Sequence, residues 1–364
     1  MPRLNDILGQ DRAINILRGA VASNRVHHAW IFSGPLGVGK RTTAEAFAGL
    51  LLDPTSAPNL AGEIEPEEGS QVQQLLAAGT HPDFHLINKE LAGVSQFSSL
   101  RGKKQANIPI DLLRERMIGG DIEERHVEAV ISKAPALGHG RVFVIDEAEL
   151  LDRYGQNSIL KTLEEPPKGC VIILVTARPE RLLPTIRSRC QRVTFGALSS
   201  KAMDDWFARS ASSFERAVEK AERTWVERFA AGSPGVAMLA IQTGLYEWSR
   251  TLEPMLEEVD RGRFPLELGP TMGKLAGAWA EEWVSKHKSA SKESANHAAV
   301  RHLGAILGDR YRRLLRDAAA KADEIAGNKA ARAIDLVNEC QTQITSNVNM
   351  NLALENLAVQ LTAR

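Results

Sequence analysis

The sequence predicts an α/β fold, in which a parallel sheet packed between helices is followed by two helical domains. Short, mostly apolar segments alternate with helical patterns in the first part of the chain, and strand-like segments end at Phe195. Such apolar runs, separated by helices, are typical of parallel strands that are buried on both faces. The predicted strands are Ala29–Ser33, Phe84–Ile87, Arg141–Asp146, Val171–Thr176 and Arg192–Phe195.

The rest of the chain is predicted to be helical. Ser213–Ala230 carries one apolar stripe at helical spacing, and Gly232 is expected to end that helix. Helical patterns also cover Ala298–Ala326 and Ala330–Leu361, after a boundary at Gly244. We therefore expect three domains: an α/β domain at residues 1–197, a small helical domain at 198–244 and an all-α domain at 245–364.

Composition narrows the class of protein. The chain has 45 basic and 45 acidic residues, so it lacks the basic excess of a protein that grips DNA by itself. No apolar run has the length of a membrane span. Cys170, Cys190 and Cys340 are far apart, which argues against a disulfide framework and a thiolate zinc site. The cytoplasm is the expected compartment.

The most specific motif is Gly34-Pro-Leu-Gly-Val-Gly-Lys40, between a strand and a helix. In a phosphate-binding loop, the glycines let backbone N–H groups converge on phosphate oxygens, and the lysine reaches the β- and γ-phosphates. Gly34, Gly37, Gly39 and Lys40 are therefore candidate ATP-binding residues. A glycine-rich turn without a ligand is the less favoured alternative.

The motif departs from its pattern after the lysine. A Ser or Thr hydroxyl at that position ligates Mg²⁺, but this chain has Arg41, which has no acceptor atom. Thr42 is one residue late and would serve only if the loop shifted. ATP binding with Mg²⁺ therefore stays open, and hydrolysis is doubtful.

A second motif is the apolar strand that ends in Asp146 and Glu147. In the Walker B pattern the aspartate holds Mg²⁺ on the nucleotide and the glutamate orients the attacking water. The alternative is an acid that only caps the following helix. Thr176 ends the next strand, where its hydroxyl would face the γ-phosphate, although a strand residue without a role is equally expected.

The third motif is Ile186-Arg187-Ser188-Arg189-Cys190. An arginine at a subunit edge can complete a neighbour's phosphate site in trans. By chemistry alone, two arginines in a loop are more often solvated surface residues.

Together, several segments resemble the AAA+ clamp-loader subunits of bacterial DNA polymerase III, delta-prime and its gamma/tau paralogue. They are HHAWIFSGPLGVGK, HPDF, VFVIDEAELL, NSILKTLEEPP, TIRSRCQRVTF and the C-terminal NVNMNLALENL, in this order. The resemblance covers nearly the whole chain but is weak between residues 200 and 340. It implies an AAA+ P-loop NTPase domain, a small helical lid domain and an all-α collar domain that holds five subunits in a ring.

The resemblance also implies roles for single residues. Arg189 matches the arginine of the family's signature triplet, which projects into the neighbouring subunit's ATP site, and Leu8-Gly9-Gln10 resembles the stretch that lines the adenine pocket. Many relatives carry a four-cysteine zinc module, but the corresponding stretch here has no cysteine, so no zinc is expected. Val236 stands where an arginine often follows the sensor-2 turn at residues 232–235.

These departures fit the delta-prime branch better than gamma/tau. The expected function is that of a ring subunit, with gamma/tau and delta as partners, which helps load the sliding clamp onto primed DNA and supplies Arg189 as an arginine finger. Its own ATPase activity is expected to be weak or absent. The alternatives are an active gamma/tau-type ATPase or a related motor such as a Holliday-junction motor, which the acidic pair keeps open, and a regulator that binds ATP without hydrolysing it.

Overall fold

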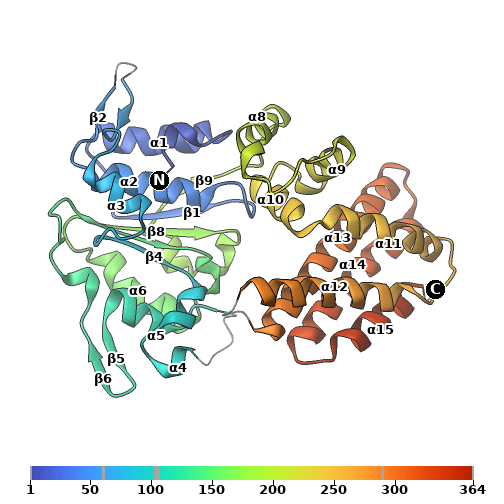
Figure 1. Cartoon of the computed structure of the whole chain (residues 1–364). Helices are drawn as coiled ribbons and strands as arrows, with labels where there is room; N and C mark the ends of the chain where they lie inside the picture. The colour runs from blue at the N-terminus through green and yellow to red at the C-terminus, as the bar shows by residue number, and fades with distance from the viewer. Residues whose placement is uncertain (1, 60–61, 102–106, 288–290, 363–364) are drawn as a thin grey trace. The chain divides into compact units, whose positions relative to one another are not determined.

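The computed structural model describes residues 2–59, 62–101, 107–287 and 291–362 (Figure 1). The chain forms two compact units. The first comprises Met1–Ala211 with Ala231–Val236, and the second comprises Ser212–Ala230 with Ala237–Arg364. The finer division into three domains stays a prediction.

The first unit is built on a five-stranded sheet with the order β4-β7-β8-β1-β9, in which every neighbouring pair is parallel. The α/β prediction is therefore confirmed, and the five predicted strands are present with ends that move by at most one residue. The strands are β1 (Ala29–Ser33), β4 (Phe84–Ile87), β7 (Arg141–Ile145), β8 (Cys170–Thr176) and β9 (Gln191–Thr194).

Helices cover both faces of this sheet. Successive strand residues point to opposite faces, so a run of apolar residues makes both faces apolar and both are buried by helices. Trp30 and Phe32 of β1 pack with Phe47 on one face, whereas Ile31 joins Phe143 in the cluster on the other face. Figure 1 shows α1 and α2 on the first side and α5 and α6 on the second. These helices are α1 (Asp11–Ala22), α2 (Lys40–Leu52), α5 (Ile110–Leu113) and α6 (Arg153–Glu164).

Short elements connect these parts of the first unit. The helices are η1 (Leu4–Asp6), α3 (Gln71–Ala77), η2 (Lys89–Val94), α4 (Ser98–Arg101), η3 (Arg114–Ile118), η4 (Val130–Ser132), η5 (Ala148–Leu150), η6 (Pro179–Arg181), α7 (Pro184–Arg187) and α8 (Ser200–Ser210). Two small antiparallel hairpins pair β2 (Ala57–Pro58) with β3 (Ile64–Glu65), and β5 (Gly120–Ile122) with β6 (Arg125–Val127).

A buried ion pair joins β4 to β7. Asp83, just before β4, accepts hydrogen bonds from the Arg141 guanidinium, with 2.8 Å between Nη2 and Oδ1. The N–H groups of Ala136 and Leu137 also donate to its carboxylate. Burial alone would raise the pKa of Asp83, but these hydrogen bonds and the charge of Arg141 lower it below its usual value. The pair joins the start of β4 to the start of β7, at the opposite end of these strands from Asp146.

The second unit is helical, with α9 (Lys220–Ala230), α11 (Leu245–Asp260), α12 (Leu268–Lys286), α13 (Lys292–Ala320), α14 (Glu324–Thr345) and α15 (Met350–Thr362). The short η7 (Ala211–Ser213) and α10 (Pro234–Thr243) each contribute residues to both units. Among the described side chains, Arg310 of α13 is 8 % exposed and pairs with Glu253 and Asp260 of α11.

Three predicted helices differ from those observed. The helix expected over Ser213–Ala230 begins only at Lys220, because residues 214–216 form bends and residues 217–219 have no regular structure. The pattern over Ala298–Ala326 spans a break, where Ala322 has a φ of 54° and Asp323 caps α14. The pattern over Ala330–Leu361 is likewise interrupted at Asn347, whose φ is 70°.

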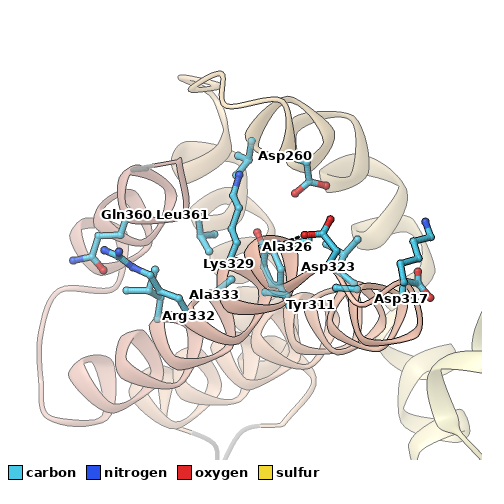
Figure 2. A pocket seen from close by; sticks show the side chains of 16 residues that line it. Asp260, Tyr311, Asp317, Asp323, Ala326, Lys329, Arg332, Ala333, Gln360 and Leu361 are labelled. Atoms are coloured by element: carbon cyan, nitrogen blue, oxygen red, sulfur yellow. Dashed lines mark hydrogen bonds between the residues drawn. The ribbon is translucent and has the colours of Figure 1, made fainter.

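A hollow of about 320 Å³ lies in the second unit, between the ends of α11 and α15 and the facing sides of α13 and α14. Figure 2 shows Tyr311 on its wall, with Ala326 and Ala333 of α14 close by. The Tyr311 side chain is 4 % exposed, and its hydroxyl has no hydrogen-bond partner among the described residues.

Candidate functional site

The phosphate loop connects the carboxyl end of β1 to the first turn of α2, as the motif predicts. Gly34, Gly37 and Gly39 all have positive φ, at 155°, 74° and 95°. A Cβ atom on Gly34 would lie 2.3 Å from the Phe195 carbonyl oxygen, so only glycine fits there. Gly39 is the left-handed N-cap residue immediately before α2. The glycines are therefore required by the shape of the loop.

The turn at residues 232–235 donates two hydrogen bonds to the phosphate loop. The Ser233 hydroxyl donates to the Leu36 carbonyl at 2.7 Å, and the Gly235 N–H donates to the Gly37 carbonyl at 2.8 Å. These bonds satisfy carbonyl groups of the loop, whereas phosphate binding uses N–H groups. The turn is the one that resembles sensor 2, and Val236 follows it without a cationic side chain.

Lys40 is buried within the loop. Its side-chain Nζ donates to the Gly34 carbonyl at 2.8 Å and to the Pro35 carbonyl at 2.5 Å. Burial lowers the pKa of Lys40, and the nearby charges of Glu149 and Asp146 oppose that shift. To bind a phosphate oxygen, the ammonium group would therefore exchange one of these carbonyl partners for it.

Glu149 belongs to this site, although sequence reasoning assigned it no role. One carboxylate oxygen accepts a hydrogen bond from the Ala177 N–H at 3.1 Å, beyond the end of β8. The other oxygen, Oε2, is buried and has no partner in the described part of the chain. The signal in the sequence was only an acid three residues after Asp146.

Arg41 contacts the Walker B aspartate across the gap between α2 and β7. Its Nη1 lies 3.6 Å from Asp146 Oδ2, while its Nε donates to Glu45 at 2.9 Å. The other aspartate oxygen, Oδ1, accepts from the Glu147 N–H at 3.0 Å. Burial raises the pKa of Asp146, and the positive charge of Arg41 offsets part of that effect.

Glu147 is also paired with a cation. It has left-handed backbone geometry, with φ of 51°, and its Oε2 lies 2.7 Å from the Nζ of Lys89. Lys89 begins η2, two residues after the end of β4, so the parallel pairing of β4 with β7 brings Lys89 and Glu147 together. No local motif in the sequence points to Lys89.

The remaining predicted ligands differ in their surroundings. Thr42 is exposed on α2, and Thr43, the next residue, donates its hydroxyl to the Gly39 carbonyl. Thr176 is 1 % exposed, and its hydroxyl accepts from the Arg178 N–H at 3.0 Å. Its backbone oxygen accepts from the Gly34 N–H at 3.3 Å, which places it beside the loop. The nucleotide contacts expected of Thr42 and Thr176 stay predictions.

Gln10 links the N-terminal stretch to the loop. Its side chain is buried and donates to the Val38 carbonyl at 3.1 Å and to the Gly196 carbonyl at 2.9 Å. Its Oε1 accepts from the Gly196 N–H. The amide of Gln10 therefore links Val38 of the loop to Gly196, just after β9. The adenine contact of residues 8–10 stays a prediction.

Arg189 follows the short helix α7. Its Nη2 lies 2.6 Å from an oxygen of Glu164, and its Nη1 donates to the Thr185 carbonyl at 3.0 Å. The side chains of Arg189 and Glu164 are 36 % and 50 % exposed. The guanidinium is therefore held at the surface by a partner that is itself accessible to solvent.

The surroundings of Asp146 do not fit a magnesium ion held by this chain. A divalent ion there needs oxygen donors, and the position that normally offers a hydroxyl carries the Arg41 guanidinium, which has only donors. Both oxygens of Asp146 already face cationic or N–H groups. The described residues thus supply anion-binding groups but not a metal site.

Comparisons with known proteins agree with the motifs. Residues 9–199 match a family described as DNA polymerase III, delta subunit. Relatives include DNA polymerase III subunit delta′ of Bacillus subtilis, 31% identical over 54% of this chain and 50% of that protein. Subunit delta′ of Pseudomonas aeruginosa is 33% identical over 50% of this chain and 47% of that protein. The chain thus matches about half the length of these curated relatives.

A solved structure of a DNA polymerase III gamma subunit-related protein from Thermotoga maritima has a TM-score of 0.43 and 18% identity, covering 95% of this chain and 98% of that one. In the described part of the chain, no helix combines the length and the apolar character that a bilayer-spanning segment needs.

The family match spans more than half of the chain. The chain therefore belongs to the DNA polymerase III delta-subunit family, and the resemblance to delta-prime subunits inferred from its motifs is confirmed.

Proposed function

We propose that this chain is the delta-prime subunit of a clamp loader, which acts in the cytoplasm as one member of a five-subunit ring with gamma/tau and delta. In that ring it helps load the sliding clamp onto primed DNA. It supplies Arg189 to the ATP site of the neighbouring subunit, where a cation stabilises charge on the transferring phosphoryl group.

The observation that carries this proposal is the contrast between Arg189 and the chain's own phosphate loop. Arg189 lies at the surface, and its Glu164 partner is half exposed, so the guanidinium can change partners at low cost. In the loop, Asp146 and Glu147 face Arg41 and Lys89. Hydrolysis needs those carboxylates for metal and water, which favours a role in trans over a role in cis.

The decisive experiment uses a clamp loader reconstituted with the full-length chain. We expect Arg189→Ala to remove turnover at the neighbouring site, since an arginine finger contributes about 10³-fold or more to that step. Clamp loading on primed DNA should fall with it. Arg187→Ala is the matched control, because Arg187 is exposed and only two residues away.

Two results would overturn the proposal. One is a loader with Arg189→Ala that hydrolyses ATP and loads clamps at the normal rate. The other is brisk Mg²⁺-dependent ATP hydrolysis by the isolated chain, which would favour the alternative of an active gamma/tau-type ATPase.

A further inference from the structure

The two Walker B acids, of which the first normally holds Mg²⁺ and the second orients water, are each paired with a cation of this chain. Arg41 lies in the first turn of α2 and reaches Asp146 at the end of β7, with 3.6 Å between Nη1 and Oδ2. Lys89 binds Glu147, with 2.7 Å between Nζ and Oε2. The two pairs come from three elements that meet at one edge of the sheet.

These pairs change what a polyphosphate meets at the loop. Without a metal ion, a free Asp146 and Glu147 would repel the phosphate oxygens. The Arg41 and Lys89 cations offset that repulsion, and Lys40 lies at the loop itself, although Arg41 also pairs with Glu45 and the Glu149 carboxylate lies near Lys40. Arg41 and Lys89 thus stand beside the two acids where a divalent ion would otherwise compensate their charge.

Arg41 also has the geometry to act on phosphate directly. A guanidinium presents its donors in a planar fork that matches two phosphate oxygens, and it stays charged at any working pH. The Arg41 side chain is 47 % exposed, so it can turn toward a ligand while remaining near Asp146. The N-terminus of α2, a helix of 13 residues, adds positive potential at the same point.

We propose that this phosphate loop binds a nucleoside polyphosphate without a divalent metal ion, with the Arg41 guanidinium in the place that Mg²⁺ takes in related sites. This inference depends on the proposed function in one respect: it assumes that a ring subunit which does not hydrolyse ATP still binds a nucleotide at its loop. Arg41 bridges Asp146 and the phosphates, Lys40 binds the phosphates within the loop, and Lys89 holds Glu147 away from the role of water-orienting base.

The test measures binding of ATP, ADP and inorganic pyrophosphate to the full-length chain by calorimetry, once with excess Mg²⁺ and once with EDTA. For the wild-type chain we expect ATP and ADP affinities in the two buffers to agree within about threefold. Pyrophosphate that bound as tightly as ADP would contradict the assignment of a nucleoside ligand and leave a bare polyphosphate site.

Three variants locate the effect. Arg41→Thr replaces the fork with a metal-binding hydroxyl, so its nucleotide affinity should fall at least about tenfold in EDTA and recover with Mg²⁺. Lys40→Ala should lose binding in both buffers, which shows that the ligand occupies the loop. Arg153→Thr, at the exposed first residue of α6, is the matched control and should bind like the wild-type chain.

The outcomes are separable from those of the proposed function. Wild-type binding that disappears in EDTA, or that is absent in both buffers, overturns the metal-independent site. Neither result changes the expected effect of Arg189→Ala in the reconstituted loader, because that assay reads the neighbouring subunit's site. An Arg41→Thr chain that binds as the wild type does in EDTA also overturns the proposal, provided that its thermal unfolding shows an intact fold.

Discussion

At the scale of single residues, the partners of the arginines decide what each can do. The pair between Arg189 and Glu164 is short, at 2.6 Å, yet both side chains are at least a third exposed. Pairs of this kind contribute about 0–1 kcal/mol, because solvent screens the charges and holding two long side chains costs entropy. Glu164 can therefore keep Arg189 ordered without preventing its transfer to a phosphate.

This weak restraint leads to a prediction for Glu164→Gln. The substitution keeps the shape of the side chain but removes the charge, so Arg189 should leave it more easily. In a reconstituted loader we expect ATP turnover with clamp and primed DNA to stay equal or to rise, by no more than about fivefold. Steady-state ATPase rates measure this.

Glu165→Gln is the matched control, since Glu165 is the next residue and is also exposed. If Glu164→Gln instead lowered turnover to the level of Arg189→Ala, Glu164 would be a positioning residue for the finger rather than a restraint. The distinction concerns Glu164 and leaves the role of Arg189 in place.

At the scale of elements, packing of α13 against α14 leaves a buried hydroxyl unsatisfied. Tyr311 lines the hollow shown in Figure 2, and its hydroxyl has no partner among the described residues. An unsatisfied buried polar group costs about 1–3 kcal/mol, and its removal leaves the aromatic packing unchanged. The element thus carries a local cost that a single substitution can remove.

We therefore expect Tyr311→Phe to raise the free energy of unfolding by about 1 kcal/mol in urea denaturation. Tyr246→Phe is the control, because Tyr246 lies on α11, is partly exposed and should change stability by less than about 0.5 kcal/mol. A loss of stability in Tyr311→Phe would show that the hydroxyl has a hydrogen-bond partner in solution, such as a bound water.

The elements also show what could be predicted from the sequence. The three central strands, β1, β7 and β8, were predictable because their apolar runs are buried on both faces of a parallel sheet. The helix breaks were missed because Ala322 and Asn347, rather than Gly or Pro, adopt positive φ there. The contact between Lys89 and Glu147 was also missed. The two residues meet only because β4 pairs with β7, and no local motif encodes that pairing.

The loop itself was predictable for a different reason. Its glycines and Lys40 form one contiguous motif, and the steric demand at Gly34 is local to the end of β1. By contrast, the contact between Arg41 and Asp146 depends on how α2 and β7 lie in the folded unit. The sequence showed that Arg41 could not bind a metal ion. It did not show that Arg41 would pair with Asp146, the acid that would otherwise hold the ion.

At the scale of the whole molecule, the chain consists of two compact units, each with an ion pair that involves a buried arginine. Asp83 and Arg141 join β4 to β7 in the first unit, and Arg310 binds Glu253 and Asp260 in the second. Removing Asp83 leaves the Arg141 charge buried and costs about 3–5 kcal/mol, whereas removing Arg310 leaves Glu253 and Asp260, which are 41 % and 34 % exposed, and costs less. Chains with several domains commonly unfold in more than one step.

We therefore predict two separable unfolding transitions that respond to different substitutions. Asp83→Asn should lower the transition of the first unit and leave the second in place, while Arg310→Leu should do the reverse. Calorimetry gives the two midpoints, and hydrogen exchange read out by mass spectrometry assigns each to its residues. Asp11→Asn and Arg250→Leu, both exposed, are the matched controls for the two units. A single transition that both Asp83→Asn and Arg310→Leu lower equally would mean that the units unfold as one cooperative body, and nucleotide bound at the phosphate loop would then also stabilise α11–α15.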